Sequence, residues 1–200
     1  MFTTLPNILT MSRIVVIPLV IGTFAMPVPL GPWTGCALFA VAGVTDWLDG
    51  KLARAWEQQS ELGRFLDPIA DKLLVATTLF MLGVERRFSA PTILPALVIL
   101  CREILVSGLR EHLAGLSVSV PVSGLAKWKT AIQMVAIAVL LVGDSGPPHL
   151  PVRWIGEALL WIAGALTVKT GWDYLRAGLV HIQDDAPPAK AAKPSPSPAS

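Results

Sequence analysis

Long apolar runs divide this chain of 200 residues, and their length limits the folds that it can adopt. A helix crosses a bilayer with about 20 mostly apolar residues, and the strict alternation of a half-buried strand is absent here. The runs of about this length span residues 8–27, 33–55, 63–84, 92–113, 126–142 and 154–176. They predict an all-α, polytopic membrane protein built as a bundle of six transmembrane helices, because a helix satisfies its own backbone polar groups within lipid.

The composition leads to the same class of protein. Hydrophobic residues make up 53% of the chain and charged residues only 15%, whereas a soluble domain carries about 25% charged residues. The net charge of +2 excludes the strongly basic surface of a nucleic-acid-binding protein. Residues 178–200 are rich in Pro, Ala, Ser and Lys, so we expect a membrane domain over 1–177 and a disordered cytoplasmic tail after it.

The positions of lysine and arginine orient the predicted bundle, because these residues collect on the cytoplasmic side of membrane proteins. With the N-terminus in the cytoplasm, all but three of the 16 basic residues fall on the cytoplasmic side. The three others are Arg86, Arg87 and Arg153. We therefore expect both termini to be cytoplasmic, as an even number of spans requires.

Four aspartates lie at or inside the cytoplasmic ends of the second and third predicted helices. Asp46 and Asp49 are three positions apart and Asp67 and Asp71 are four apart, so each pair shares one helix face. A carboxylate within a spanning helix costs at least about 2.5 kcal/mol to insert, so four of them need compensation. The short connection between the helices lets the two faces converge. Pro68 suits a first helical turn, which predicts that Asp67 caps the third helix.

Oxygen ligands without nearby His or Cys suit hard divalent cations such as Mg²⁺ or Mn²⁺. Four carboxylates shared between two ions form the two-metal clamp that assists phosphoryl transfer. The small residues Gly50 and Ala53 let a diphosphate approach the second helix, and Arg54 can grip a phosphate with two hydrogen bonds. Two other interpretations remain open, namely interfacial aspartates paired with Arg54, Arg64 and Lys72, or the cation pathway of a transporter.

These residues belong to one continuous pattern. It reads Asp46-Trp-Leu-Asp49-Gly50-Lys-Leu-Ala53-Arg54, then Gly63 after eight residues, and then Asp67 and Asp71. The pattern resembles the signature D-x-x-D-G-x-x-A-R-x8-G-x3-D-x3-D of the CDP-alcohol phosphatidyltransferase family, and every fixed position is matched. The resemblance extends over the six-helix core, roughly residues 5–177.

The resemblance implies roles for the four aspartates. Asp46, Asp49 and Asp67 resemble the ligands of one metal ion, and Asp46, Asp67 and Asp71 resemble those of a second. Asp71 also matches the residue that acts as general base toward the acceptor alcohol. The resemblance therefore implies two divalent cations, Mg²⁺ or Mn²⁺, as cofactors.

The resemblance also implies contacts with CDP-diacylglycerol. Gly50 and Arg54 resemble residues that hold the diphosphate, with Ser60 as a weaker candidate in the connecting turn. The segment from Asn7 to Thr10 resembles the part of the family that contacts the nucleotide. Helix capping explains Asn7 and Thr10 equally well, and the two roles are compatible.

The acceptor alcohol varies within the family, and residues further along the chain bear on it. The segments 102–111 and 127–133 resemble the branch that uses sn-glycerol 3-phosphate. Arg110, Lys127 and Lys129 lie at cytoplasmic ends of adjacent predicted helices, where they can form a cationic pocket for a phosphorylated acceptor. Anchoring to anionic headgroups is the alternative for each of them. For the deeper residues 102 and 103, a buried ion pair is the simpler interpretation, and orienting the acceptor pocket is the functional one.

The expected function is therefore transfer of the phosphatidyl group of CDP-diacylglycerol to sn-glycerol 3-phosphate, giving phosphatidylglycerol phosphate and CMP. The alternatives are another acceptor (inositol phosphate, serine or phosphatidylglycerol) and, outside this class, a cation transporter. The family branch implies the bacterial inner membrane, with the active site facing the cytoplasm. It also implies a homodimer, for which the small residues Gly156 and Gly164 are a weak hint.

Overall fold

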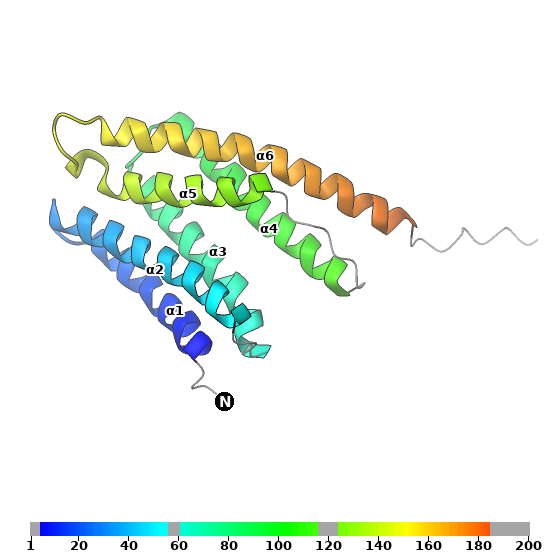
Figure 1. Cartoon of the computed structure of the whole chain (residues 1–200). Coiled ribbons are helices and arrows are strands. Elements are labelled where there is room, and N and C mark those ends of the chain that lie inside the picture. The colour runs from blue at the N-terminus through cyan, green and yellow to red at the C-terminus, as the bar shows by residue number, and fades with distance from the viewer. Residues whose placement is uncertain (1–4, 56–60, 116–123, 185–200) are drawn as a thin grey trace, which may run out of the picture.

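The computed structural model describes residues 5–55, 61–115 and 124–184. These residues form α-helices joined by turns, with two short 3-10 helices, η1 (Ala90–Thr92) and η2 (Gly143–Ser145). The α-helices are α1 (Leu5–Thr23), α2 (Leu30–Ala55), α3 (Glu61–Val84), α4 (Ile93–Gly115), α5 (Gly124–Val142) and α6 (Val152–Asp184) (Figure 1). The predicted all-α fold is confirmed for this part of the chain.

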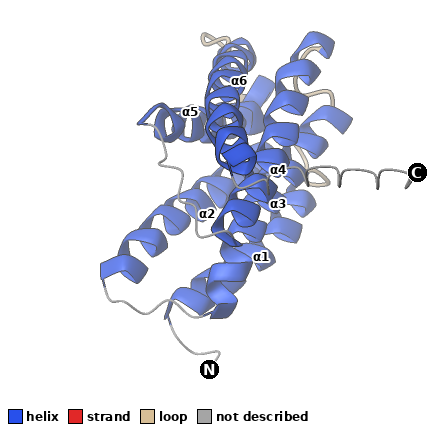
Figure 2. Ribbon diagram, turned by 90° about the vertical axis from the view of Figure 1, so that its right-hand side faces the viewer, coloured by secondary structure: helices blue, strands red, loops and turns tan. Residues whose placement is uncertain are grey.

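Successive helices run in opposite directions. The beginnings of α1, α3 and α5 and the ends of α2, α4 and α6 therefore lie toward one end of the bundle, which we call the site end (Figure 1). The helix α6 packs along both α5 and α4, while α1 packs against α2 and α3. Figure 2 shows the same two groups of helices from the side. The contacts of α5 with α2 join the groups.

The helix ends differ from the predicted ones because hydropathy marks the lipid-facing part of a helix, while backbone hydrogen bonds continue into water. The helix α3 begins at Glu61, so Pro68 lies inside it and Asp67 is not its N-cap, contrary to the prediction. The helix α6 continues to Asp184, so residues 178–184, which the composition assigned to a disordered tail, are helical. Residues 185–200 lie outside the described part.

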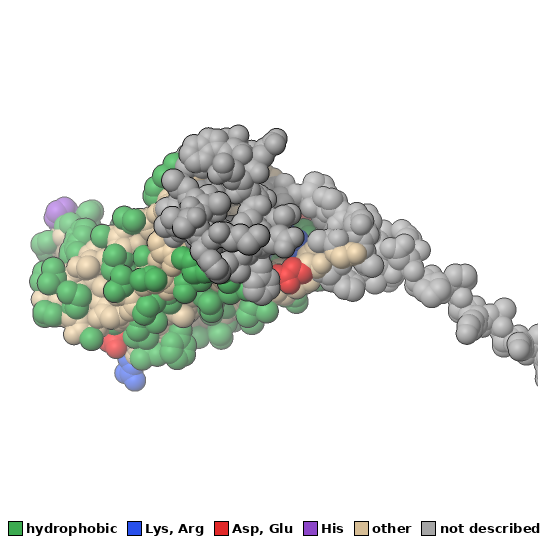
Figure 3. Space-filling model, turned by 90° about the horizontal axis from the view of Figure 1, so that it is seen from below, with side chains coloured by type: hydrophobic (Ala, Val, Ile, Leu, Met, Phe, Trp, Pro, Cys, Tyr) green, Lys and Arg blue, Asp and Glu red, His purple; other side chains and the backbone are tan. Residues whose placement is uncertain are grey.

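Large apolar side chains cover much of the outer surface (Figure 3). Phe80, Ile104 and Trp172 are among them, with 68%, 70% and 68% of their surface exposed. Within the described residues, the segments Ala90–Glu111 and Gly124–Ser145 are long and apolar enough to cross a membrane. Such a large exposed apolar surface suits contact with the hydrocarbon of a bilayer, whereas its contact with water is unfavourable.

The interior of the bundle is apolar where the two groups of helices meet. All six α-helices contribute buried side chains to it, among them Val20, Phe39, Leu74, Ile99, Ile137 and Leu160. This core lies between the site end and the opposite end, so it fixes the relative positions of the helices that carry the polar residues described below.

Glycines bring helices of this chain close together. A Cβ built on Gly156 would lie 2.8 Å from Leu140 Cγ on α5, and one on Gly164 would lie 2.8 Å from Pro95 Cβ on α4. Small residues allow such close approach of helix backbones. Both glycines are therefore used for packing within the chain, and they no longer support a homodimer.

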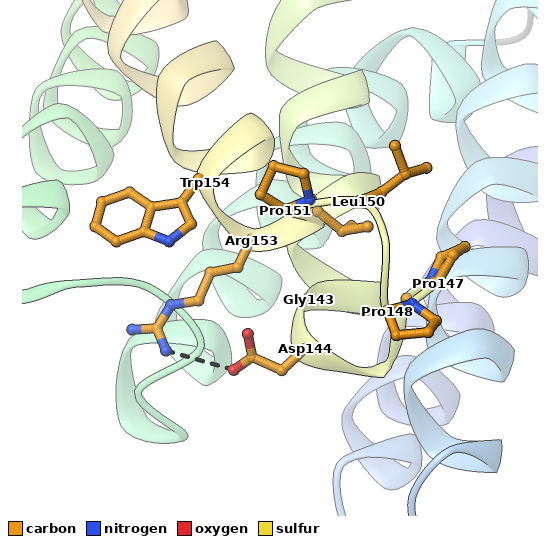
Figure 4. Close-up of a pocket in the computed structure, with 10 residues that line it drawn as sticks. Gly143, Asp144, Pro147, Pro148, Leu150, Pro151, Arg153 and Trp154 are labelled. Carbon is orange, nitrogen blue, oxygen red and sulfur yellow. Dashed lines mark hydrogen bonds and ion pairs between the residues drawn. The ribbon is translucent and has the colours of Figure 1, made fainter.

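A polar network holds the end of the bundle opposite the site end. The buried Glu157 of α6 accepts hydrogen bonds from the Ser89 backbone N–H at 2.9 Å and from Thr92 Oγ1 at 2.6 Å. Arg153 Nε donates to the same carboxylate at 3.2 Å, and Arg153 Nη1 lies 3.4 Å from Asp144 Oδ2 (Figure 4). This network ties α6 to the α3–α4 connection and to the turn after α5.

Candidate active site

The helices α1 and α2 bring a buried arginine to one of the predicted metal ligands. Arg13 Nη1 lies 2.8 Å from Asp46 Oδ1, and the side chain of Arg13 is 2% exposed while that of Asp46 is 44% exposed. The arginine compensates the charge of a carboxylate within an apolar bundle. Because Asp46 stays partly open, its carboxylate remains accessible to a ligand from outside the chain.

The helix α3 adds the half-buried Asp71 to the same charged region. Its carboxylate interacts electrostatically with Asp46 and Glu103, which carry the same charge, and with Arg13 and Lys72, which carry the opposite charge. Like charges held near each other favour the binding of a cation, since a cation relieves their repulsion.

The helices α4 and α5 contribute a second ion pair. Lys129 Nζ donates a hydrogen bond to Glu103 Oε1, and Arg102 Nη1 lies 3.3 Å from the same oxygen. The side chain of Lys129 is 3% exposed, and its charge also interacts with Asp71. The predicted ion pair of Arg102 and Glu103 is thus present, and it extends to Lys129.

The helix α6 borders this region through Gly171. A Cβ on Gly171 would lie 3.0 Å from Arg102 Cγ, so the glycine makes room for the arginine side chain. Closer to the site end, the Arg110 guanidinium lies 5.8 Å from the centre of the Tyr174 ring, within the range of a cation–π contact.

A contact between α2 and α5 lies close to these residues. A Cβ on Gly43 would lie 2.7 Å from Met134 Cε, so the Met134 side chain reaches α2 about one turn before Asp46.

Several predicted site residues cannot be placed in the same detail. Asp49, Gly50 and Arg54 lie on the last turns of α2, and Asp67 lies on α3, but their side chains are outside the described part. The same holds for Asn7 and Thr10 on α1. Ser60 lies outside the described residues altogether.

The three predicted acceptor-binding residues are not placed alike. Lys129 is buried in the charged region, whereas Lys127 and Arg110 are exposed. Positions two apart on a helix point in nearly opposite directions, so Lys127 cannot share the face of Lys129. Of these three residues, the structure brings only Lys129 into contact with Glu103.

Sequence reasoning gave no site role to Arg13, and it placed Gln133 in a segment resembling one branch of the family without giving it a role of its own. For Arg13 a signal was available, because it is a charge inside an apolar run. Gln133 is 3% exposed, and its Oε1 is a buried atom without a hydrogen-bond partner. Its position, one turn after Lys129 on the buried face of α5, was the available signal.

The described donors fit hard divalent cations. Asp46 and Asp71 supply carboxylate oxygen, the ligand type that Mg²⁺ and Mn²⁺ prefer, and Asp46 is accessible. The positively charged side chains of Arg13 and Lys129 lie beside these carboxylates. Such charges suit the anionic groups of a phosphorylated substrate. Among the described residues, the region thus brings carboxylates and basic side chains together.

The fold and this site define an all-helical membrane protein with a carboxylate centre between its helices. Comparison with known proteins identifies the class, because the family profile described as CDP-alcohol phosphatidyltransferase matches residues 3–169. The chain belongs to this family.

Its relatives include bacterial proteins named CDP-diacylglycerol–glycerol-3-phosphate 3-phosphatidyltransferase. The one from Rickettsia bellii is 47% identical over 173 residues, covering 86% of this chain and 94% of the relative. That from Cereibacter sphaeroides is 40% identical, covering 91% and 98%, and that from Shigella flexneri is 42% identical, covering 90% and 97%.

Proposed function

We propose that this chain is an enzyme that transfers the phosphatidyl group of CDP-diacylglycerol to sn-glycerol 3-phosphate, releasing CMP and forming phosphatidylglycerol phosphate. The observation that carries the proposal is the partly open Asp46, which Arg13 holds at 2.8 Å. With Asp71 on a different helix, Asp46 belongs to the fully matched family signature. The names of relatives at 40–47% identity over most of the chain support the choice of acceptor.

The chemical step is an in-line displacement at phosphorus. The 1-hydroxyl oxygen of the acceptor attacks the phosphorus that carries diacylglycerol, and the bond from that phosphorus to the bridging oxygen of CMP breaks. CMP leaves with the electron pair of that bond. Asp71 takes the proton of the hydroxyl as general base. This assignment needs no covalent intermediate on the protein.

We assign Asp46, Asp49, Asp67 and Asp71 as the ligands of two divalent cations, Mg²⁺ or Mn²⁺. When bound, the cations neutralise the diphosphate and stabilise charge on the attacking and leaving oxygens.

The remaining predicted residues bind the substrates in this proposal. Gly50 and Arg54 hold the diphosphate of CDP-diacylglycerol with help from Ser60, and Asn7 and Thr10 contact the cytidine. For the acceptor phosphate we retain the three basic residues that the sequence predicts, which are Arg110, Lys127 and Lys129. Because Lys129 is buried beside the carboxylates, it binds the acceptor phosphate inside the site. The exposed Arg110 and Lys127 attract the acceptor toward the site.

We further propose six membrane spans with both termini in the cytoplasm, in the inner membrane of a bacterium. The site end then faces the cytoplasm, from which sn-glycerol 3-phosphate reaches the carboxylates. CDP-diacylglycerol enters sideways from lipid, with its CDP headgroup on the cytoplasmic side. A homodimer follows from the family alone, and cross-linking in membranes tests it.

The test is CMP release by the protein purified in detergent. CDP-diacylglycerol is supplied with sn-glycerol 3-phosphate, inositol phosphate, serine or phosphatidylglycerol, each in Mg²⁺, Mn²⁺ or EDTA. Release that needs both a divalent cation and sn-glycerol 3-phosphate supports the proposal. Release with a different alcohol keeps the chemistry and replaces the acceptor. Absence of release with every alcohol, together with cation flux in liposomes, favours the transporter.

A further inference from the structure

A buried amide on α5 has an unused hydrogen-bonding atom beside the charged region. Gln133 is 3% exposed, and its Oε1 has no hydrogen-bond partner in the structure. A buried carbonyl oxygen without a partner costs about 1–3 kcal/mol. Such an atom inside a bundle needs an explanation, and a ligand that supplies the missing donor is one.

The position of Gln133 limits what that donor can be. Lys129 precedes it by four residues, and both belong to the buried face of α5, so their Cβ atoms are about 5–6 Å apart. Lys129 also interacts electrostatically with Asp71 of α3. A ligand that reaches Gln133 therefore also meets an ammonium group and a carboxylate.

Lys129 keeps donors for such a ligand. An ammonium group has three N–H donors, and the hydrogen bond to Glu103 uses one of them. The ammonium can therefore bind phosphate oxygens while Glu103 holds it in place. A phosphate at Lys129 and a hydroxyl at Gln133 make a pair of groups one helical turn apart.

We propose that Gln133 selects the acceptor by accepting a hydrogen bond, through Oε1, from the secondary hydroxyl of a three-carbon alcohol phosphate whose phosphate binds Lys129. This inference rests on the proposed function. In sn-glycerol 3-phosphate, one bridging oxygen and two carbons separate the phosphorus from that hydroxyl, a span comparable to one helical turn. The reacting primary hydroxyl lies one carbon further and is left free for Asp71.

The experiment compares two acceptors that differ only in the secondary hydroxyl. They are sn-glycerol 3-phosphate and 3-hydroxypropyl phosphate, which keeps the phosphate and the primary hydroxyl. The value of kcat/KM for each is measured by CMP release with the full-length protein. We expect kcat/KM of the wild-type protein to be about 10- to 100-fold higher for sn-glycerol 3-phosphate. This factor corresponds to the loss of one buried hydrogen bond that leaves the Gln133 carbonyl oxygen without a donor.

Gln133→Met removes the amide at nearly constant volume. It should lower kcat/KM for sn-glycerol 3-phosphate by the same factor and leave that for 3-hydroxypropyl phosphate unchanged, so that the preference disappears. Gln133→Asn, which withdraws the carbonyl by one carbon, should show the same pattern. Met134→Leu, on the neighbouring face that packs against α2, is the matched control and should keep the preference.

The outcomes separate this inference from the proposed function. A wild-type protein that releases no CMP with sn-glycerol 3-phosphate refutes the proposed function. A wild-type protein that uses both acceptors equally refutes only the role of Gln133, as does a variant that loses both activities to the same extent while eluting as folded protein. An unchanged preference in Gln133→Met also overturns it.

Discussion

Replacing Glu103 with leucine and Lys129 with methionine, first singly and then together, tests the ion pair that links α4 to α5. The two side chains are 19% and 3% exposed, so water screens their charges only slightly. Glu103→Leu leaves the Lys129 ammonium and the Arg102 guanidinium without their shared carboxylate. Removing one partner of a buried ion pair costs about 3–5 kcal/mol, and we expect about 3 kcal/mol here because Arg102 is partly exposed.

The double variant should be more stable than Glu103→Leu alone. Two apolar side chains in place of a buried ion pair are often nearly neutral, although Arg102 still loses its contact at 3.3 Å. Lys129→Met alone should cost about 2 kcal/mol or less, because Arg102 continues to compensate Glu103. The second substitution therefore restores most of the stability that the first one removed, while activity stays low because Lys129 is absent.

Thermal unfolding in detergent measures this cycle through tryptophan fluorescence. For a chain of this size, about 3 kcal/mol corresponds to a decrease in Tm of roughly 10 °C. If the double variant loses as much stability as the two single variants together, or more, Glu103 and Lys129 are not coupled. That result would refute the description of the site.

Three further predictions use the same preparation. Asp71→Asn should keep the Tm and lower kcat by about 100-fold or more, the usual contribution of a general base; turnover near the wild-type value would remove the base assignment. Gly164→Ala should lower the free energy of unfolding by about 1–3 kcal/mol, because its methyl group would press on Pro95. Gly108→Ala has open space around it and should not lower the Tm. Equal effects of the two substitutions would contradict the packing of α4 on α6. Glu157→Gln should lower the Tm by a few degrees through weakened hydrogen bonds and leave kcat at low temperature unchanged. A large loss of kcat without a loss of stability would instead give the Glu157 network, at the end opposite the site end, a role in catalysis.

The helices could be predicted from the sequence, but their ends could not. The thickness of a bilayer sets the length of the apolar run that a spanning helix needs, so each run predicted a helix. The beginning of α3 at Glu61 and the end of α6 at Asp184 lie in polar sequence, where intrahelical hydrogen bonds rather than lipid decide. For this reason the sequence predicts Pro68 in a first turn, whereas it lies inside α3.

The candidate site was predictable as far as helix faces allow. The spacing of the aspartates placed each pair on one face, but periodicity does not give the rotation of one helix relative to another. The partners Arg13 for Asp46 and Glu103 for Lys129 depend on that rotation, so they appear only in the structure. The separation of Lys127 from Lys129 was within reach, since positions two apart on a helix cannot share a face.

The central claim is that the chain joins the phosphatidyl group to sn-glycerol 3-phosphate. The most direct measurement uses radiolabelled sn-glycerol 3-phosphate and compares its incorporation into extractable lipid with CMP release in the same reaction. We predict equal amounts of both products, and loss of both in EDTA. CMP release without incorporation of the label, or incorporation that continues in EDTA, would contradict the account.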